Sequence, residues 1–319
     1  MQQKKATYPP AGRHLLALTL ALLSINGASG EGYRLLTIKN YLTTMKQQTD
    51  LLTTKEAQYF TTGDGQQIAF KLDGPEDAPV LILSNSIATN FRMWEGQIPA
   101  FTQHFRILRF DTRGHGSSDA PAGNYSIARM GWDVIELMNH LNIQHAHFCG
   151  LSLGGFIGQW LAIHAPDRIN RLVLANTSSH LGPQAQWNEH IISLNAGASM
   201  HAYGDMFIGN WFPQKMIEAR DSTVSKFRKM VLDTSPQGLA GSFAAVRDTD
   251  LRRTITLIPN PTLVIGGAYD GVTLPEHSEE IAASIPGARL VILPVVHLSN
   301  VENSDDFERL VIDFLLTDD

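Results

Sequence analysis

The sequence predicts an α/β protein with a mostly parallel central sheet, helices on both faces of that sheet and an inserted helical cap. Short apolar runs alternate with segments of helical periodicity from about residue 58 onward. The run at 80–83 is continuously apolar, as is typical of a parallel strand covered on both faces. The chain has 319 residues, 43% hydrophobic and 18% charged, which allows a large buried core.

The predicted elements follow one another in a regular order. Gly63-Asp64-Gly65 supplies the glycines that a tight hairpin turn needs, and strand-like segments flank it at 58–62 and 67–72. Further strands are predicted at 80–83, 106–110, 146–149, 172–174, 262–265 and 290–293. Helical periodicity covers 127–141, 153–165, 277–284 and 306–316.

The alternation is interrupted between about residues 179 and 256. This stretch lacks a strand signal and is rich in large apolar side chains, Trp187 and Trp211 among them. We expect residues 179–256 to form a helical cap on a core of residues 56–178 and 257–319. The aromatic side chains of the cap either line a substrate pocket or pack the cap's own small core.

Residues 1–55 are predicted to lie outside this fold, and two interpretations of them remain open. Basic residues precede an apolar run at 15–25 and small residues at 27–30, which is the layout of a secretory signal. The run is shorter than the roughly 20 apolar residues of a membrane-spanning helix. Alternatively, the working protein starts at Met45 and the preceding residues are an over-extended start.

Charge and composition limit the partners. The formal net charge is −6, which argues against a nucleic acid or a membrane surface as partner and leaves a small molecule as the expected one. Cys149 is the only cysteine, and it lies in an apolar strand, where a buried inert thiol is expected. His145 and His147 share a face of the same strand without a third ligand nearby, so no metal site is predicted.

Gly150-Leu151-Ser152-Leu153-Gly154 follows a predicted strand and opens a predicted helix. A strand-to-helix turn this sharp strains the central residue, and glycines on both sides avoid collisions with neighbouring elements. The hydroxyl of Ser152 is then exposed at the carboxyl end of the sheet. This context favours Ser152 as a nucleophile.

A serine nucleophile needs a base within hydrogen-bond reach and an acid that orients that base. In folds of this kind the partners follow in the order Ser, then Asp or Glu, then His. Asp270 and His297 satisfy that order, and each comes just after a predicted strand. His115 is the best rival histidine, but it precedes the serine.

Such a site also needs donors for the oxyanion of the reaction. The backbone N–H of Leu153, next to the nucleophile, is the expected first donor. The loop after the strand at 80–83 supplies the second, with the N–H of Ile87 as the candidate. Ser86 is a candidate for an additional contact through its hydroxyl.

Several motifs make the chain resemble the 3-oxoadipate enol-lactonase family of the α/β-hydrolase superfamily. The Asn85-Ser86 pair is informative because most members of the superfamily carry His-Gly there. The similarity extends over about residues 56–317. The segments that carry it are 83–87, 93–94, 109–116, 146–152, 247–252 and 297–302.

The resemblance implies the α/β-hydrolase fold and hydrolysis of 3-oxoadipate enol-lactone to 3-oxoadipate in aromatic compound catabolism, the beta-ketoadipate pathway. It implies no cofactor and no metal. It also implies a cytoplasmic enzyme, which favours the over-extended start over an export signal. Two other functions remain open: another carboxylic ester hydrolase or cofactor-free perhydrolase with the same triad, and a non-catalytic binding protein on the same scaffold. The sequence does not fix the oligomeric state.

The carboxylate of such a lactone needs a cationic or hydrogen-bonding partner. Where the family tends to carry basic residues, this chain has His180 and His190, on either side of Trp187. We expect these histidines to contact the substrate in a pH-dependent way. Arg113 and Arg247 are alternative partners, unless they form structural ion pairs.

Overall fold

A computed structural model describes residues 57–317 of the protein. The predicted extension 1–55, with both interpretations of it, lies outside these residues. Within residues 57–317, no helix combines the length and the apolar character that a membrane span requires.

The core of the fold is an eight-stranded sheet in the order β1-β2-β4-β3-β5-β6-β7-β8. β2 runs antiparallel to β1 and β4, and all other neighbours are parallel. The predicted strands are all present; β4 has the predicted bounds and the others have shifted ends. They are β1 (Gln58–Thr61), β2 (Gln67–Asp73), β3 (Val80–Ser84), β4 (Arg106–Phe110), β5 (Ala146–Leu151), β6 (Ile169–Ala175), β7 (Thr262–Gly267) and β8 (Arg289–Leu293).

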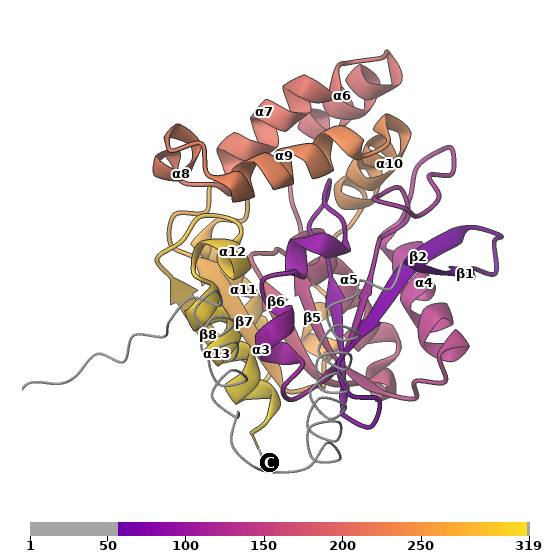
Figure 1. Ribbon diagram of the computed structural model, residues 1–319, viewed down its shortest axis with the longest axis vertical. Helices are drawn as coiled ribbons and strands as arrows, with labels where there is room; N and C mark the ends of the chain where they lie inside the picture. The colour runs from indigo at the N-terminus through magenta and orange to yellow at the C-terminus, as the bar shows by residue number, and fades with distance from the viewer. Residues whose placement is uncertain (1–56, 318–319) are drawn as a thin grey trace, which may run out of the picture. The chain divides into compact units, whose positions relative to one another are not determined.

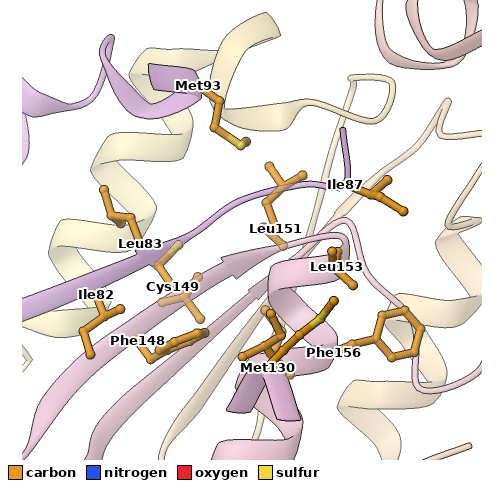
Figure 2. Packing of buried hydrophobic residues seen from close by; sticks show 14 of the residues in the cluster. Ile82, Leu83, Ile87, Met93, Met130, Phe148, Cys149, Leu151, Leu153 and Phe156 are labelled. Atoms are coloured by element: carbon orange, nitrogen blue, oxygen red, sulfur yellow. The ribbon is translucent and has the colours of Figure 1, made fainter. Parts of the chain in front are cut away.

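The central strands have the burial that their continuous apolar sequences predict. Every residue of β5 and β7 is buried, whereas β8 lies at the sheet edge and exposes most of its side chains. Figure 2 shows the core around β5, where Phe148 and Cys149 pack between the sheet and its helices. The prediction that Cys149 is buried is confirmed, and burial raises the pKa of its thiol.

Helices cover both faces of the sheet, as predicted (Figure 1). α5 packs against β3, β5 and β6 and contacts α4, while α11 packs against β7 and β8. The longer helices of the core are α4 (Ile127–His140), α5 (Leu153–His164), α11 (Pro275–Ser284) and α13 (Ser304–Leu315). Shorter ones are η1 (Phe91–Trp94), α3 (Ile98–Phe101), η2 (Pro166–Arg168), η3 (Ile255–Leu257) and α12 (Ser299–Glu302).

Five α-helices and the short η3 occupy the interval between β6 and β7, and the five α-helices lie where the helical cap is predicted. In Figure 1 they lie together beyond one end of the strands. α6 packs against α10, and α7 against α9. Their bounds are α6 (Gln184–Asn195), α7 (Met200–Trp211), α8 (Gln214–Glu218), α9 (Ser222–Asp233) and α10 (Pro236–Arg247).

Candidate active site

Ser152 lies on the turn between β5 and α5, in the conformation that its sequence context predicts. Its φ of 56° and ψ of −114° fall outside the regions that non-glycine residues ordinarily occupy. Such a conformation is typical of a sharp strand-to-helix turn. Within residues 57–317 the hydroxyl makes no hydrogen bond to a protein group, and the residue is 8% exposed. The hydroxyl is therefore free to turn toward a base or a substrate.

The glycines of the motif are required by close contacts. A Cβ on Gly150 would lie 2.1 Å from the carbonyl oxygen of Gly154. A Cβ on Gly154 would lie 2.2 Å from the carbonyl oxygen of Ser84 on β3. Both atoms belong to the backbone and cannot move aside, so larger residues at these two positions would displace the nucleophile turn.

His297 and Asp270 are brought together by neighbouring strands. Asp270 follows β7 and His297 follows β8, and these strands are adjacent and parallel. The Nδ1 of His297 lies 2.8 Å from the Oδ2 of Asp270. The two residues are 1% and 2% exposed. This geometry fixes Nδ1 as the protonated nitrogen and leaves Nε2 as the basic one.

The Asp270 carboxylate accepts further hydrogen bonds from its own loop. Its Oδ1 accepts from the N–H groups of Val272, at 2.8 Å, and Thr273, at 3.0 Å. Its Oδ2 also accepts from the Thr273 hydroxyl, at 2.7 Å. Burial opposes ionisation of Asp270, but the attraction of His297 and the hydrogen bonds outweigh it and lower the pKa to about 2. Asp270 is therefore ionised at neutral pH.

The loop after β3 places a second backbone donor near the nucleophile turn. The carbonyl oxygen of Asn85 accepts from the N–H of Gly154 at 3.0 Å, which ties this loop to the start of α5. The Asn85 side chain donates to the Phe110 carbonyl and accepts from the Trp94 indole. Within residues 57–317, the N–H groups of Ile87 and Leu153 donate to no protein acceptor. Both remain available to a ligand.

A cavity of about 490 Å³ joins these groups under the cap. Ser152, His297, Ile87 and Leu153 all line it; in Figure 2, Ile87 and Leu153 lie at the carboxyl end of the strands. No Lys, Arg, Asp or Glu is among the described residues that line it. The cap and the loop after β7 supply most of the remaining wall, namely Leu181, Gly182, Gln186, Trp187, His190, Met206, Phe207, Asn210, Trp211, Phe243, Val246, Gly271, Val272 and Leu274. Phe156 of α5 and His277 of α11 complete it.

Residues 79–304 match the family described as the alpha/beta hydrolase fold. The match covers more than half of the chain and includes strands β3 to β8, the turn at Ser152 and the cap. The chain belongs to the α/β-hydrolase fold family. The resemblance to the enol-lactonases is also confirmed by individual relatives of this hydrolase.

One such relative is 3-oxoadipate enol-lactonase 2 of Acinetobacter baylyi, 37% identical over 75% of this chain and 89% of its own length. The enol-lactonase of Burkholderia xenovorans LB400 has a solved structure, with 37% identity and a TM-score of 0.79 over 82% of this chain and all of the other. A hydrolase from Pseudomonas aeruginosa PA01 has 54% identity and a TM-score of 0.82 over 83% of this chain and all of the other.

Three of the candidate substrate contacts in the α/β-hydrolase line its cavity. Trp187 and His190 on α6 and Trp211 on α7 all contribute to the wall. The His190 ring stacks on Phe243 of α10, with ring centroids 5.2 Å apart. Burial lowers the pKa of His190, although Glu189 opposes that shift, so His190 is neutral at pH 7. Ser86 is buried in the loop beside Ile87 and is not among the lining residues.

The other candidates lie away from the cavity. Arg113 forms a bidentate ion pair with Asp133: its Nε and Nη2 donate to the two carboxylate oxygens, each at 2.6 Å. The Nη1 of Arg113 also pairs with Asp64. His180 directs Nδ1 to the Thr249 carbonyl at 3.1 Å. Arg247 pairs with its neighbour Asp248. For both arginines, the structure therefore matches the alternative of an ion-pair role.

Some polar residues around the cavity are not among the residues predicted from the sequence. Gln186, Asn210 and His277 are polar residues of the cavity wall. Nothing in their local sequence distinguishes them from ordinary helix surface, because only the packing of the folded cap and of α11 decides which face lines the cavity. Thr273 had a usable signal, since an Asp followed three residues later by Thr is typical of a carboxylate that accepts local hydrogen bonds.

His115, the rival candidate for the base, and His145 and His147, the pair considered for a metal, do not line the cavity. His115 is 1% exposed in the loop after β4 and does not line the cavity. Its Nδ1 contacts the Arg113 carbonyl at 3.2 Å, and its Nε2 has no partner within residues 57–317. Across the same residues no three His, Cys, Asp or Glu side chains are grouped to hold a metal, so His145 and His147 have no third ligand there.

Protonation of His115 is expected to destabilise the fold in acid. Burial lowers the pKa of His115 from 6.5 to about 4, so the unfolded chain binds the proton first as the pH falls. The free energy of unfolding is therefore unaffected by protonation of His115 above pH 6.5. It falls by about 3 kcal/mol between pH 6.5 and pH 4. Urea unfolding of the wild type and His115→Gln at several pH values measures this. A constant difference in unfolding free energy between the two proteins would contradict it.

Proposed function

We propose that this α/β-hydrolase is a serine-type enzyme that opens 3-oxoadipate enol-lactone. One observation supports this chemistry above the others. Ser152, on its strained turn, shares a cavity with His297, and the Nδ1 of His297 is held by ionised Asp270. Acyl transfer by a serine nucleophile uses these three groups, a serine, a histidine base and an acid that orients the base.

In the proposed reaction, the Nε2 of His297 removes the proton from Ser152 Oγ as that oxygen attacks the lactone carbonyl. The carbonyl oxygen becomes an oxyanion and accepts hydrogen bonds from the N–H groups of Ile87 and Leu153. The ring C–O bond then breaks, and the departing enol oxygen takes the proton from His297. Since this oxygen stays attached to the acyl chain, no first product leaves.

Hydrolysis of the acyl-enzyme completes the cycle. His297 removes a proton from water, the resulting hydroxide attacks the ester carbon, and the Ser152–acyl bond breaks as Ser152 regains its proton. The product is a free carboxylic acid. Asp270 remains ionised throughout and stabilises the imidazolium form of His297 in both halves of the reaction.

The cavity wall suggests how the carboxylate arm of the lactone binds. No fixed cation is among the described residues of the wall, so neutral donors carry the interaction. Gln186 and Asn210 offer amide N–H groups, and His190 offers a ring nitrogen that hydrogen-bonds no protein group within residues 57–317. Aromatic faces of Trp187 and Phe243 flank the same space and suit an unsaturated ring.

Steady-state kinetics test the substrate. We expect kcat/KM for the enol-lactone to exceed that for p-nitrophenyl acetate by roughly 10²-fold or more, because only the lactone engages the polar groups of the wall. Peracid formation from acetate and hydrogen peroxide is measured in parallel. Efficient turnover of the simple ester or peracid formation, without lactone turnover, would instead identify the alternative hydrolase or perhydrolase.

The variant His190→Arg sharpens the same test. A guanidinium at residue 190 is expected to lower KM for the anionic lactone roughly ten-fold through a charge-assisted hydrogen bond. KM for uncharged p-nitrophenyl acetate should not change. His180→Arg is the matched control, because His180 also lies between β6 and β7 but does not line the cavity. Equal effects of the two variants would argue against a carboxylate site at His190.

A further inference from the structure

The turn after β6 brings an unassigned amide side chain to the Asp270–His297 pair. Asn176 directly follows β6 and is fully buried, at 0% exposure. Its φ of 43° is positive, a conformation that Asn tolerates better than most residues. Its backbone N–H donates to the Ile265 carbonyl of β7 at 2.8 Å, which fixes the turn against the neighbouring strand.

The side chain of Asn176 connects two loops. Its Nδ2 donates to Asp270 Oδ2 at 3.1 Å and to the Val296 carbonyl at 3.2 Å. The first acceptor lies on the loop after β7, and the second lies directly before His297. Both neighbours are pure acceptors, so the amide must present its NH₂ group to them. A single group therefore links the acid and the segment that carries the base.

The contact of Asn176 with the Val296 carbonyl depends on the glycine at position 267. A Cβ on Gly267, at the end of β7, would lie 2.5 Å from the Val296 carbonyl oxygen and 3.0 Å from Asn176 Nδ2. Any side chain there would separate the two groups. Thr273 also donates to Asp270, but it belongs to the same loop as Asp270. Asn176 comes from a different strand and so relates the loops after β7 and β8 to each other.

We propose that Asn176 is a positioning residue of the hydrolytic site, which holds the Asp270 carboxylate and the segment before His297 in register. This inference rests on the proposed function, in which Asp270 orients His297. Asn176 does not line the cavity, so its loss should lower the rate of the chemical step and leave substrate binding unchanged.

The first test removes the side chain with Asn176→Gly, since glycine accepts the positive φ. We measure the rate at which a fluorophosphonate labels Ser152, and kcat and KM for p-nitrophenyl acetate. We expect labelling and kcat to fall roughly ten-fold and KM to stay within about two-fold, because a displaced base costs rate rather than affinity. Both readouts are independent of the natural substrate.

Asn260 provides a matched control. It is also buried, and its Nδ2 also donates to two backbone carbonyls, those of Pro166 and Ile169. Asn260 precedes β7 and Asn176 follows the parallel strand β6, so the two residues lie at opposite ends of the strands. Asn260→Gly should lower the stability of the fold without slowing the labelling of Ser152.

The second test, Asn176→Asp, uses a pH readout that a purely structural role would not move. Two adjacent carboxylates share a proton, and the protonated one can donate to Asp270 as the amide does. The nearby titratable groups are Asp270, His297 and Glu302, which accepts from the Val296 N–H. We expect the variant-to-wild-type ratio of kcat to rise as the pH falls from about 8 to about 6.

The outcomes separate the two hypotheses. Asn176→Gly that labels as fast as the wild type, or an Asn176→Asp ratio that is flat with pH, would overturn the positioning role. If the wild type itself is neither labelled nor active on any ester or lactone, the proposed function fails instead. Slow labelling of Asn176→Gly together with normal labelling of Asn260→Gly supports the proposal.

Discussion

Replacing Ser152 with Ala is expected to remove hydrolytic activity, with kcat falling by roughly 10⁶-fold. Without the Oγ there is no atom to form the acyl-enzyme, and His297 and the oxyanion donors retain only a small residual effect. The fold should be unaffected, because the Ser152 hydroxyl hydrogen-bonds no protein group within residues 57–317. Turnover of the enol-lactone and thermal unfolding of the purified variant measure both expectations.

Ser242→Ala is the control for this substitution. Ser242 is fully buried on α10, and its hydroxyl also lacks a partner within residues 57–317, but it does not line the cavity. This variant should keep the wild-type rate. Substantial turnover by Ser152→Ala would rule out the acyl-enzyme and with it the serine-type mechanism.

Replacing Asp270 with Asn is expected to lower kcat by roughly 10⁴-fold. The neutral amide neither holds the Nδ1–H tautomer of His297 nor stabilises the imidazolium that forms during the reaction. The amide also offers fewer acceptors than the carboxylate to the groups that donate to Asp270 in the wild type. The free energy of unfolding should therefore fall by about 1–3 kcal/mol. Single-turnover kinetics and urea unfolding measure the two effects separately.

A modest loss in Asp270→Asn would point to another acid. Glu302 is the nearest alternative in the hydrogen-bond network, since its carboxylate accepts from the N–H of Val296, one residue before His297. Glu302→Gln then identifies the acid. If Asp270 has the proposed role, Glu302→Gln should cost much less activity than Asp270→Asn.

In the proposed function, the reaction and the recognition of the substrate depend on different parts of the molecule. Ser152, Asp270 and His297 lie at strand ends, where the rigid sheet holds them. The groups that would recognise the lactone arm lie on α6 and α7 of the cap. Packing between cap helices, rather than the sheet, sets their positions. Changes in the cap would therefore alter the substrate while the reaction stays the same.

Much of the fold could be predicted from the sequence because its signals are local. Continuous apolar runs predicted the buried strands, and 3.6-residue periodicity predicted the helices between them. The turn at Ser152 was predictable because Gly150 and Gly154 are required by contacts within a few residues and with the adjacent strand β3. The ends of elements were less certain: β6 runs from Ile169 to Ala175, several residues longer than its apolar run at 172–174.

The surroundings of the site were not predictable in the same way. Arg113 and His180 were reasonable candidates for a substrate carboxylate, yet Arg113 pairs with Asp133 and His180 with the Thr249 carbonyl. A charged or polar side chain takes whichever partner the fold brings near. The sequence pattern does not predict the partner, because the partner lies on another helix, strand or loop.

The sequence by itself determined the α/β architecture, the strained serine turn and the chain order of Ser152, Asp270 and His297. Only the tertiary structure decided that the cavity wall lacks a fixed cation among the described residues and that Asn176 contacts Asp270, 94 positions away. The physical reason is strand order. β6 and β7 are neighbours in the sheet although the whole cap separates them in the chain, and no local periodicity records that pairing.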